Sequence, residues 1–179
     1  MTPVIWPDGR AGRRTESMTT VITGATADAV HALVGVSSPT SLQRRFFLPA
    51  PMDPETVWAR YGHYLLAGPP RGSAVVATVD GAPVGLLNLI VVGVRTVELS
   101  LLVADGWQRR GVATRLLATE LGEPRWAGWT VQATVQPDNL PVRSLLRSGR
   151  FGTWQLVDRD LSSWDFALSL PSRQIPAVA

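Results

Sequence analysis

A glycine at the start of a predicted helix, directly after an apolar strand, could hold a phosphate group. The apolar run Val97–Val103 leads through a short loop into Gln108-Arg109-Arg110-Gly111-Val112-Ala113. Small residues let the main chain come close to a ligand, and the first N–H groups of a helix attract negative charge. Arg109 and Arg110 add positive charge. We expect a pyrophosphate on the amides of residues 109–113, although one glycine there is also compatible with a purely structural turn.

One acidic residue, Glu98, lies within the apolar run. A carboxylate can accept a proton from a nucleophile, directly or through a water molecule. Burial in an apolar strand would raise its proton affinity toward a useful value. Glu98 is therefore a candidate general base. The alternative is an edge-strand glutamate that faces water or pairs with an arginine.

The rest of the chain predicts the elements that position these residues. Alternating and β-branched patterns predict strands over residues 18–23, 74–79, 84–92, 96–103, 129–135, 153–157 and 164–170. Asp80-Gly81 predicts a hairpin turn. Capping residues and apolar spacing predict helices from Thr26 or Asp28 to 36, after Ser38-Pro39, and over 53–66, 110–121 and 139–148. This order predicts an α/β domain with a mixed central sheet and flanking helices.

Composition narrows the class of protein. The 179 residues are enough for one domain, which we place at 18–171, between a flexible N-terminal arm (1–17) and a C-terminal tail (172–179). The chain has no cysteine, which excludes disulfides, cysteine metal sites and a thiol nucleophile. His31 and His63 stand alone, so we expect no metal.

Charge and hydropathy bear on the partners. All 17 basic residues are arginines, scattered along the chain, and the net charge is only +3. This pattern argues against nucleic-acid binding. The longest apolar run is too short for a membrane span, and no signal peptide is visible, so we expect a cytoplasmic protein with no membrane partner.

The glycine turn resembles a known family signature. Gln108-x-x-Gly111-x-Ala113 is similar to the Q/R-x-x-G-x-G/A motif that binds acetyl-CoA in the GNAT acetyltransferase superfamily. Asn139 and the helix after it, up to Phe151, resemble the later helix of that family. Asn139 falls on an asparagine near the pantetheine arm, and is equally compatible with a helix cap.

This resemblance implies a GNAT fold: a mixed, mostly antiparallel sheet of about seven strands with flanking helices. Strands four and five should splay apart near Leu102 to admit the pantetheine arm. Acetyl-CoA is the implied co-substrate. The residues expected to bind it are Leu101, Leu102, Val103, Gln108, Arg109, Arg110, Gly111, Val112, Ala113, Thr114 and Asn139.

A closer likeness concerns Ser38-Pro39-Thr40-Ser41-Leu42-Gln43-Arg44-Arg45-Phe46-Phe47. It resembles a segment of bacterial GNAT protein-lysine acetyltransferases, in which Glu98 falls on the proposed catalytic glutamate. Two departures stand out: Leu146 replaces a frequent tyrosine that protonates the leaving thiolate, and Arg150 replaces a glycine. The tyrosine also tends to be absent from that subgroup.

The resemblance implies direct acetyl transfer to an amine, on a protein lysine or a small molecule, in a ternary complex. The N–H of Leu102 or Val103 is the expected donor to the oxyanion. The alternative function is a catalytically silent acyl-CoA-binding sensor or interaction module. A homodimer is possible in either case.

Overall fold

A seven-stranded sheet forms the centre of the protein. The computed structural model describes residues 19–172, so most of the predicted arm and tail lie outside the described residues. The strands are β1 (Thr20–Gly24), β2 (Gly72–Val79), β3 (Ala82–Gly93), β4 (Thr96–Val103), β5 (Thr130–Val135), β6 (Gln155–Arg159) and β7 (Trp164–Ser169). Their order is β1-β2-β3-β4-β5-β7-β6, and only β4 and β5 run parallel. The prediction of a mixed, mostly antiparallel sheet is confirmed.

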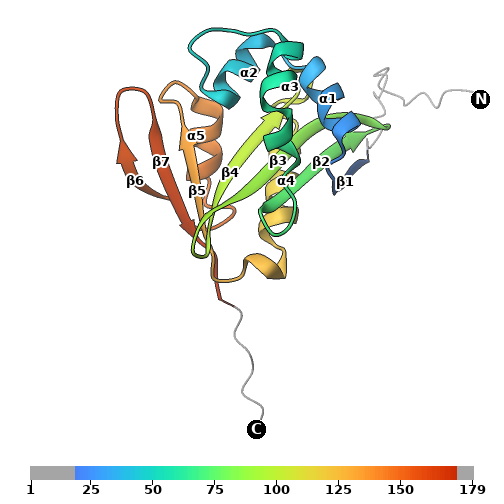
Figure 1. Ribbon diagram of the computed structural model, residues 1–179. Coiled ribbons are helices and arrows are strands. Elements are labelled where there is room, and N and C mark those ends of the chain that lie inside the picture. The colour runs from blue at the N-terminus through green and yellow to red at the C-terminus, as the bar shows by residue number, and fades with distance from the viewer. Residues whose placement is uncertain (1–18, 173–179) are drawn as a thin grey trace, which may run out of the picture.

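Helices cover both faces of this sheet (Figure 1). The helices are α1 (Ala27–Gly35), α2 (Pro39–Phe46), α3 (Pro54–Tyr61), α4 (Val112–Leu121) and α5 (Leu140–Arg147), with 3-10 turns η1 (Gly62–Leu66), η2 (Asp105–Trp107) and η3 (Pro124–Trp126). The first three α-helices pack with β3 and β4 in one apolar cluster, which includes Leu33, Leu86 and Leu102. α4 packs on the opposite face, where Leu116 and Leu117 meet Val97 and Leu87.

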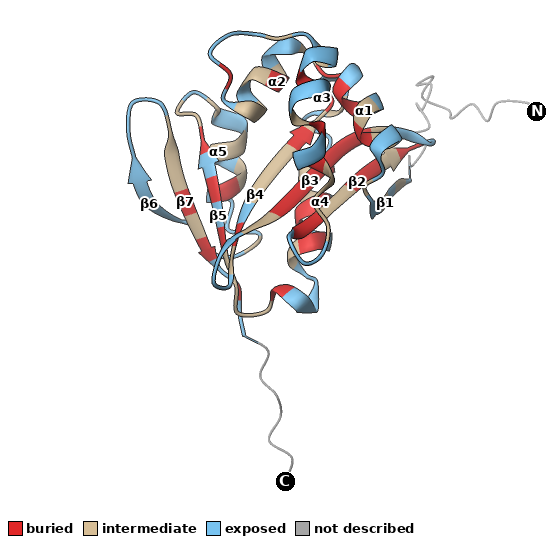
Figure 2. Ribbon diagram, viewed as in Figure 1, coloured by how far each residue is buried: buried red, intermediate tan, exposed pale blue. Residues whose placement is uncertain are grey.

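Burial follows this layering (Figure 2). The inner strand β3 is buried over residues 84–89, whereas every residue of the edge strand β6 is exposed. Alternate residues of one strand point to opposite faces. Leu99, Leu101 and Val103 therefore face α4 and α5, while Glu98, Ser100 and Leu102 face the side of α1–α3.

Local sequence signals explain where the first helices begin. The side chains of Thr26, Ser38 and Asp53 each accept a hydrogen bond from a main-chain N–H of the first turn. Proline follows Ser38 and Asp53 at the first helical position, where its missing N–H costs nothing. These caps fix the start of each helix. The sequence predicts caps at Thr26 or Asp28 and at Asp53, whereas it predicts only a turn at Ser38-Pro39.

The hairpin prediction is confirmed as well. Asp80 and Gly81 both have positive φ angles, of 50° and 80°. Two consecutive positive φ angles are typical of the tight turn that matches the twist of an antiparallel pair.

Several predicted boundaries are wrong. β1 begins two residues later than predicted, and β2 and β3 each begin two residues earlier. The helix expected over 53–66 ends at Tyr61 and continues as the 3-10 turn η1, where Gly62 packs against the Trp58 ring with no room for a Cβ. The helix expected from Arg110 begins at Val112, because Gly111 adopts a left-handed conformation. β6 starts and ends two residues later than predicted, since a fully exposed strand leaves no alternating pattern in the sequence.

Candidate functional site

The two parallel strands at the centre of the sheet form a fork. β4 and β5 pair only through Thr96 with Thr130, Val97 with Val131, and Glu98 with Gln132. Beyond Glu98 they diverge, β4 staying with β3 and β5 with β7 (Figure 1). The predicted splay is confirmed, but it begins after Glu98 rather than near Leu102. Glu98 therefore lies at the base of the fork.

The main chain of β4 presents donors to this fork. The N–H of Ala104 donates to the carbonyl of Val84 on β3, at 3.0 Å. N–H groups along a strand point alternately to its two sides. The N–H of Leu102 therefore points toward β3, and those of Leu101 and Val103 point into the fork. Of the two oxyanion donors expected, the register supports Val103 and not Leu102.

Glu98 is exposed on the α1–α3 side of the sheet. The expectation that apolar neighbours bury it is wrong, because the apolar cluster under α1–α3 includes Leu102 of β4 and does not include Glu98. Its neighbours on the same face are mixed: Gln132 of β5 and Ser100 two residues along β4 are polar, whereas Ile90, opposite it on β3, is apolar. The carboxylate is thus open to an acceptor or a water molecule arriving from that side.

The loop before α4 has the geometry of an anion site. Gly111 is the N-cap of α4 with φ 83°, and Arg109 also has a positive φ, of 62°. No side chain caps this helix, and its first internal bond runs from the N–H of Arg115 to the carbonyl of Gly111, at 3.0 Å. The N–H groups of Val112, Ala113 and Thr114 precede that bond and have no partner within the helix. They suit a phosphate.

Arginines border this helix start. The side chains of Arg109 and Arg110 are exposed, and the Arg110 guanidinium lies 5.1 Å from the centre of the Trp107 ring. Val112, by contrast, is buried and contacts the core, so only its main chain faces the loop. The predicted phosphate residues are thus adjacent, with free amides inside and two cationic side chains outside.

Asp105 ties this loop to α2, and sequence reasoning missed it. Its carboxylate accepts hydrogen bonds from the Ser38 N–H (2.8 Å), the Ser38 hydroxyl (2.9 Å) and the Ser41 hydroxyl (2.8 Å). Partial burial would raise the pKa of Asp105, but the hydrogen bonds from Ser38 and Ser41 outweigh it and lower that pKa. The Ser-Pro-x-Ser spacing was the available signal, because it places both hydroxyls at one helix start.

The Gln108 side chain belongs to the same network. Its Nε2 donates to the Ser41 hydroxyl and to the carbonyl of Val103, both at 3.2 Å. The Gln108 side chain therefore links the loop to β4 through Val103 and to α2 through Ser41. The main-chain N–H of Gln108 donates to the carbonyl of Asp105 at 3.3 Å.

The remaining predicted residues lie on α5, across the fork. Asn139 is the N-cap of α5, its Oδ1 accepting from the Val142 N–H at 3.4 Å. The side-chain oxygen of Asn139 therefore acts as a helix cap, which was the alternative interpretation of this residue. Leu146 is buried in an apolar cluster with Phe166 and Ala133. A leucine side chain cannot donate a proton.

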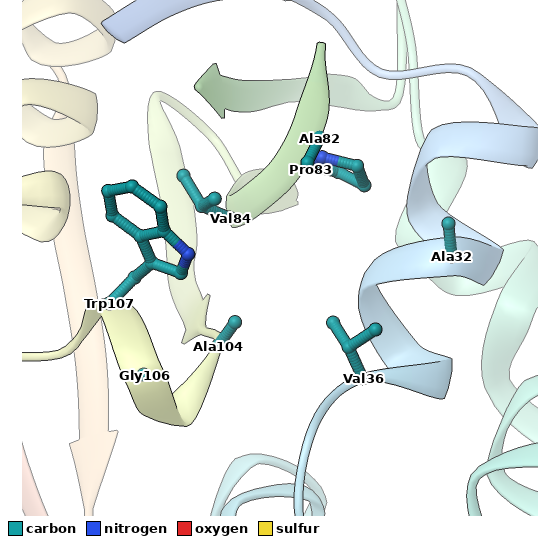
Figure 3. A pocket seen from close by; sticks show the side chains of 8 residues that line it. All are labelled: Ala32, Val36, Ala82, Pro83, Val84, Ala104, Gly106 and Trp107. Carbon is teal, nitrogen blue, oxygen red and sulfur yellow. The ribbon is translucent and has the colours of Figure 1, made fainter. Parts of the chain in front are cut away.

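The loop of residues 104–111 between β4 and α4 is called the phosphate loop. An apolar groove of about 330 Å³ lies beside it (Figure 3). The indole of Trp107 faces α1 across it. Its lining consists of Ala32, Val36, Ala82, Pro83, Val84, Ala104, Gly106 and Trp107. None of the predicted site residues lines it, so the groove is distinct from the fork.

A match to a protein-family model shows to which family this chain belongs. The model of the acetyltransferase (GNAT) family matches residues 40–150, which include all but the first residue of α2, the whole of β4, the loop before α4 and the whole of α5. The chain belongs to the GNAT acetyltransferase family. A search of curated proteins finds none that matches the chain.

Solved structures show the same GNAT fold. The GNAT domain of S. lividans PAT has a TM-score of 0.69 at 21% identity, covering 93% of this chain and 95% of that one. A putative acetyltransferase from Salmonella typhimurium, solved with its cofactor acetyl-CoA, has a TM-score of 0.65 at 19% identity, with coverage of 89% and 99%. The ribosomal-protein-S18-alanine N-acetyltransferase from Escherichia coli has 0.62 at 17%, covering 88% and 98%.

Family membership makes this protein an acetyltransferase with acetyl-CoA as its co-substrate. The observed site fits that co-substrate: free helix N–H groups for the pyrophosphate, and a fork beyond Glu98 for the pantetheine arm. Among residues 19–172, no group of His, Asp and Glu could hold a metal ion. No helix in this part of the GNAT domain is long and apolar enough to cross a membrane.

Proposed function

We propose that this protein transfers the acetyl group of acetyl-CoA to a primary amine, with Glu98 as the general base. One observation carries the proposal: the fork opens at Glu98, so an exposed carboxylate stands where the thioester and an acceptor could meet. The pyrophosphate would lie on the amides of Arg109 to Ala113. The pantetheine arm would follow the free edge of β4 past Val103.

The reaction follows from these groups. The amine nitrogen attacks the thioester carbon, the C–N bond forms and the C–S bond breaks. Glu98 takes the proton that the amine loses, and the N–H of Val103 donates to the developing oxyanion. A thiol has a pKa of about 8.5, so it can leave as thiolate without a strong acid. A buried Leu146 in place of a tyrosine is compatible with this route.

The accessibility of Glu98 favours an amine carried on a larger molecule. Gln132 and Thr134 of β5 are exposed on the same face as Glu98. An acceptor approaching that face meets an open sheet surface with polar side chains. A lysine side chain on a protein can reach such a surface with its flexible stem. We therefore place a protein lysine first among the acceptors and small amines second.

The test is release of free thiol from acetyl-CoA in the presence of separate acceptors. These are a lysine-containing protein mixture, lysine peptides, a peptide with an N-terminal alanine, and small polyamines. We expect release with lysine-containing protein or peptides, and the acetylated residue identified by mass spectrometry. Tight acetyl-CoA binding with no release on any acceptor would instead support the silent CoA-binding module.

A further inference from the structure

Arg45 occupies an unusual position beneath α2. It stands in the last turn of that helix, yet its side chain turns back toward the sheet and is only partly exposed. Its Nη2 lies 3.5 Å from the Oδ1 of Asn88, and its Nε is buried without a hydrogen-bond partner. The guanidinium also lies 4.9 Å from the centre of the Phe46 ring. An arginine with so few bonds in this setting needs another compensating interaction.

Its neighbour Asn88 fixes where the guanidinium lies. Asn88 is 1% exposed, and its Nδ2 donates to the carbonyl of Leu65 at 2.8 Å. In the β3–β4 register, Asn88 is opposite Ser100, and Ile90 is opposite Glu98. Asn88 and Glu98 are therefore diagonal neighbours on the same face of two paired strands, a separation that long side chains span.

The charges agree with this geometry. Burial lowers the pKa of Arg45 to about 10, and the negative charge of Glu98 acts against that decrease. Arg45 remains protonated at neutral pH. The guanidinium thus supplies a positive charge from inside the fold, at Asn88, the diagonal neighbour of the proposed base.

We propose that Arg45 is a positioning residue that keeps the Glu98 carboxylate ionised and directed at the fork when acetyl-CoA and acceptor exclude water. This inference rests on the proposed role of Glu98. An opposite charge nearby favours the ionised form of a carboxylate, whereas loss of water disfavours it. The positive charge of Arg45 offsets this loss of water, so that Glu98 can still accept a proton when acetyl-CoA and the acceptor are bound.

Other charged groups on this face are already engaged or more distant. On α2, the exposed Arg44 pairs with Asp138 of the β5–α5 loop at 3.4 Å. On β7, Asp165 accepts a hydrogen bond from Thr134 at 2.7 Å. The facing residues Ile90 and Gln132 carry no charge. Asp138 and Asp165 would both oppose ionisation of Glu98, which leaves Arg45 as the favourable contribution from within the fold.

Carboxyl-carbon NMR of protein labelled at glutamate tests this directly. The chain has five glutamates, and Glu98→Gln identifies the Glu98 signal by its loss. The titration midpoint of Glu98 is measured with and without coenzyme A. In Arg45→Gln we expect this midpoint to rise by about 0.5–1 pH unit, because a nearby opposite charge has been removed. In Arg45→Lys, which keeps the charge, the midpoint should rise by less than about half as much as in Arg45→Gln.

Arg44→Gln is the matched control. It removes the same charge one residue away on an exposed side chain, where solvent screens it, and should move the midpoint by about 0.2 unit or less. An unchanged midpoint in folded Arg45→Gln overturns the proposal, as does an equal rise in Arg44→Gln. A thermal melt checks folding. If Arg45→Gln does not fold, the Glu98→Gln variant, whose changed residue is exposed, tests the same coupling. In that variant the NMR signal of the Arg45 Nε–H group should shift relative to wild type. An unshifted signal overturns the proposal.

A kinetic measurement separates this inference from the proposed function. If Arg45 acts through Glu98, Arg45→Gln should lower kcat by roughly tenfold in wild type and by less than about twofold in the Glu98→Gln background. An equal loss in both backgrounds overturns the positioning role. If Glu98→Gln retains full activity while the NMR midpoint moves as expected, the charge coupling stands and only the proposed base is wrong.

Discussion

Asp105 holds Ser38 through two hydrogen bonds, one from the main-chain N–H at 2.8 Å and one from the hydroxyl at 2.9 Å. Ser38 is the N-cap of α2, and Asp105 begins the turn that leads into the phosphate loop. The two residues are 67 positions apart in sequence. One carboxylate therefore fixes α2 to the loop that precedes α4, the loop proposed to bind acetyl-CoA.

This contact predicts a pH dependence of stability. The pKa of Asp105 is lowered in the folded state, so its contribution is present above the unfolded value of about 3.9 and is lost as the pH falls below it. Asp105→Asn should cost about 1 kcal/mol of unfolding free energy at pH 7, a modest value because the group is exposed. The difference should shrink as the pH falls below about 4, where the unfolded chain takes up a proton at Asp105. Urea unfolding at several pH values measures it.

Ser41→Ala is the companion variant, because it removes one of the donors and leaves the carboxylate. We expect a smaller loss at pH 7 than for Asp105→Asn. A difference between wild type and Asp105→Asn that stays constant from pH 7 to pH 3 would contradict the role assigned to the ionised carboxylate.

Replacing Gly111 in the phosphate loop should weaken the binding of acetyl-CoA. In the free protein a Cβ there has open space, so the cause of the defect is not crowding within the fold but the φ of 83°, which a β-branched residue tolerates poorly. Gly111→Val should weaken acetyl-CoA binding by roughly tenfold or more, through a displaced amide and reduced approach of the ligand. Isothermal titration calorimetry measures the affinity.

Gly106→Ala is the matched control for that experiment. Gly106 lies in the same loop, has no positive φ, and would place its Cβ in open space. Its affinity for acetyl-CoA should stay within about twofold of wild type. Equal affinities for a folded Gly111→Val and the wild type would remove the loop from the binding site.

The proposed base predicts a rate effect without a binding effect. Glu98→Gln keeps the shape and loses the proton acceptor, so kcat at neutral pH should fall by about 10²–10⁴-fold while acetyl-CoA affinity changes little. Raising the pH should partly restore the rate, because more of the amine is then already neutral. Initial rates of thiol release from pH 6.5 to 9.5 give both quantities. A loss of less than about threefold would show that another group or the solvent takes the proton.

The absence of lysine predicts an unusual behaviour in assays. Because the chain has no lysine side chain, its own α-amino group is the amine available for self-acetylation. Intact mass after long incubation with acetyl-CoA should therefore show at most one acetyl group on an amine. Several added acetyl groups would mean that hydroxyl groups are acylated, and the proposed amine chemistry would need revision.

Local features of the fold were readable from the sequence because short-range contacts produce them. Thr26, Ser38 and Asp53 cap helices through hydrogen bonds to residues three positions away, and Asp80-Gly81 makes a turn within two residues. The phosphate loop belongs to this class too, since Gly111 determines its conformation within one turn. Only its boundary was misplaced: a glycine with positive φ ends the extended segment and delays the helix to Val112.

The environment of Glu98 was decided only by tertiary structure. The sequence places Glu98 in an apolar strand and predicts burial, but its exposure depends on how far the apolar cluster beneath α1–α3 extends along β4, and that cluster includes Leu102 but not Glu98. The partners of Asp105 and Arg45 likewise lie on elements far away in the chain. Strand divergence and side-chain contacts across elements arise from the packing of the whole domain, and no local pattern of residues encodes them.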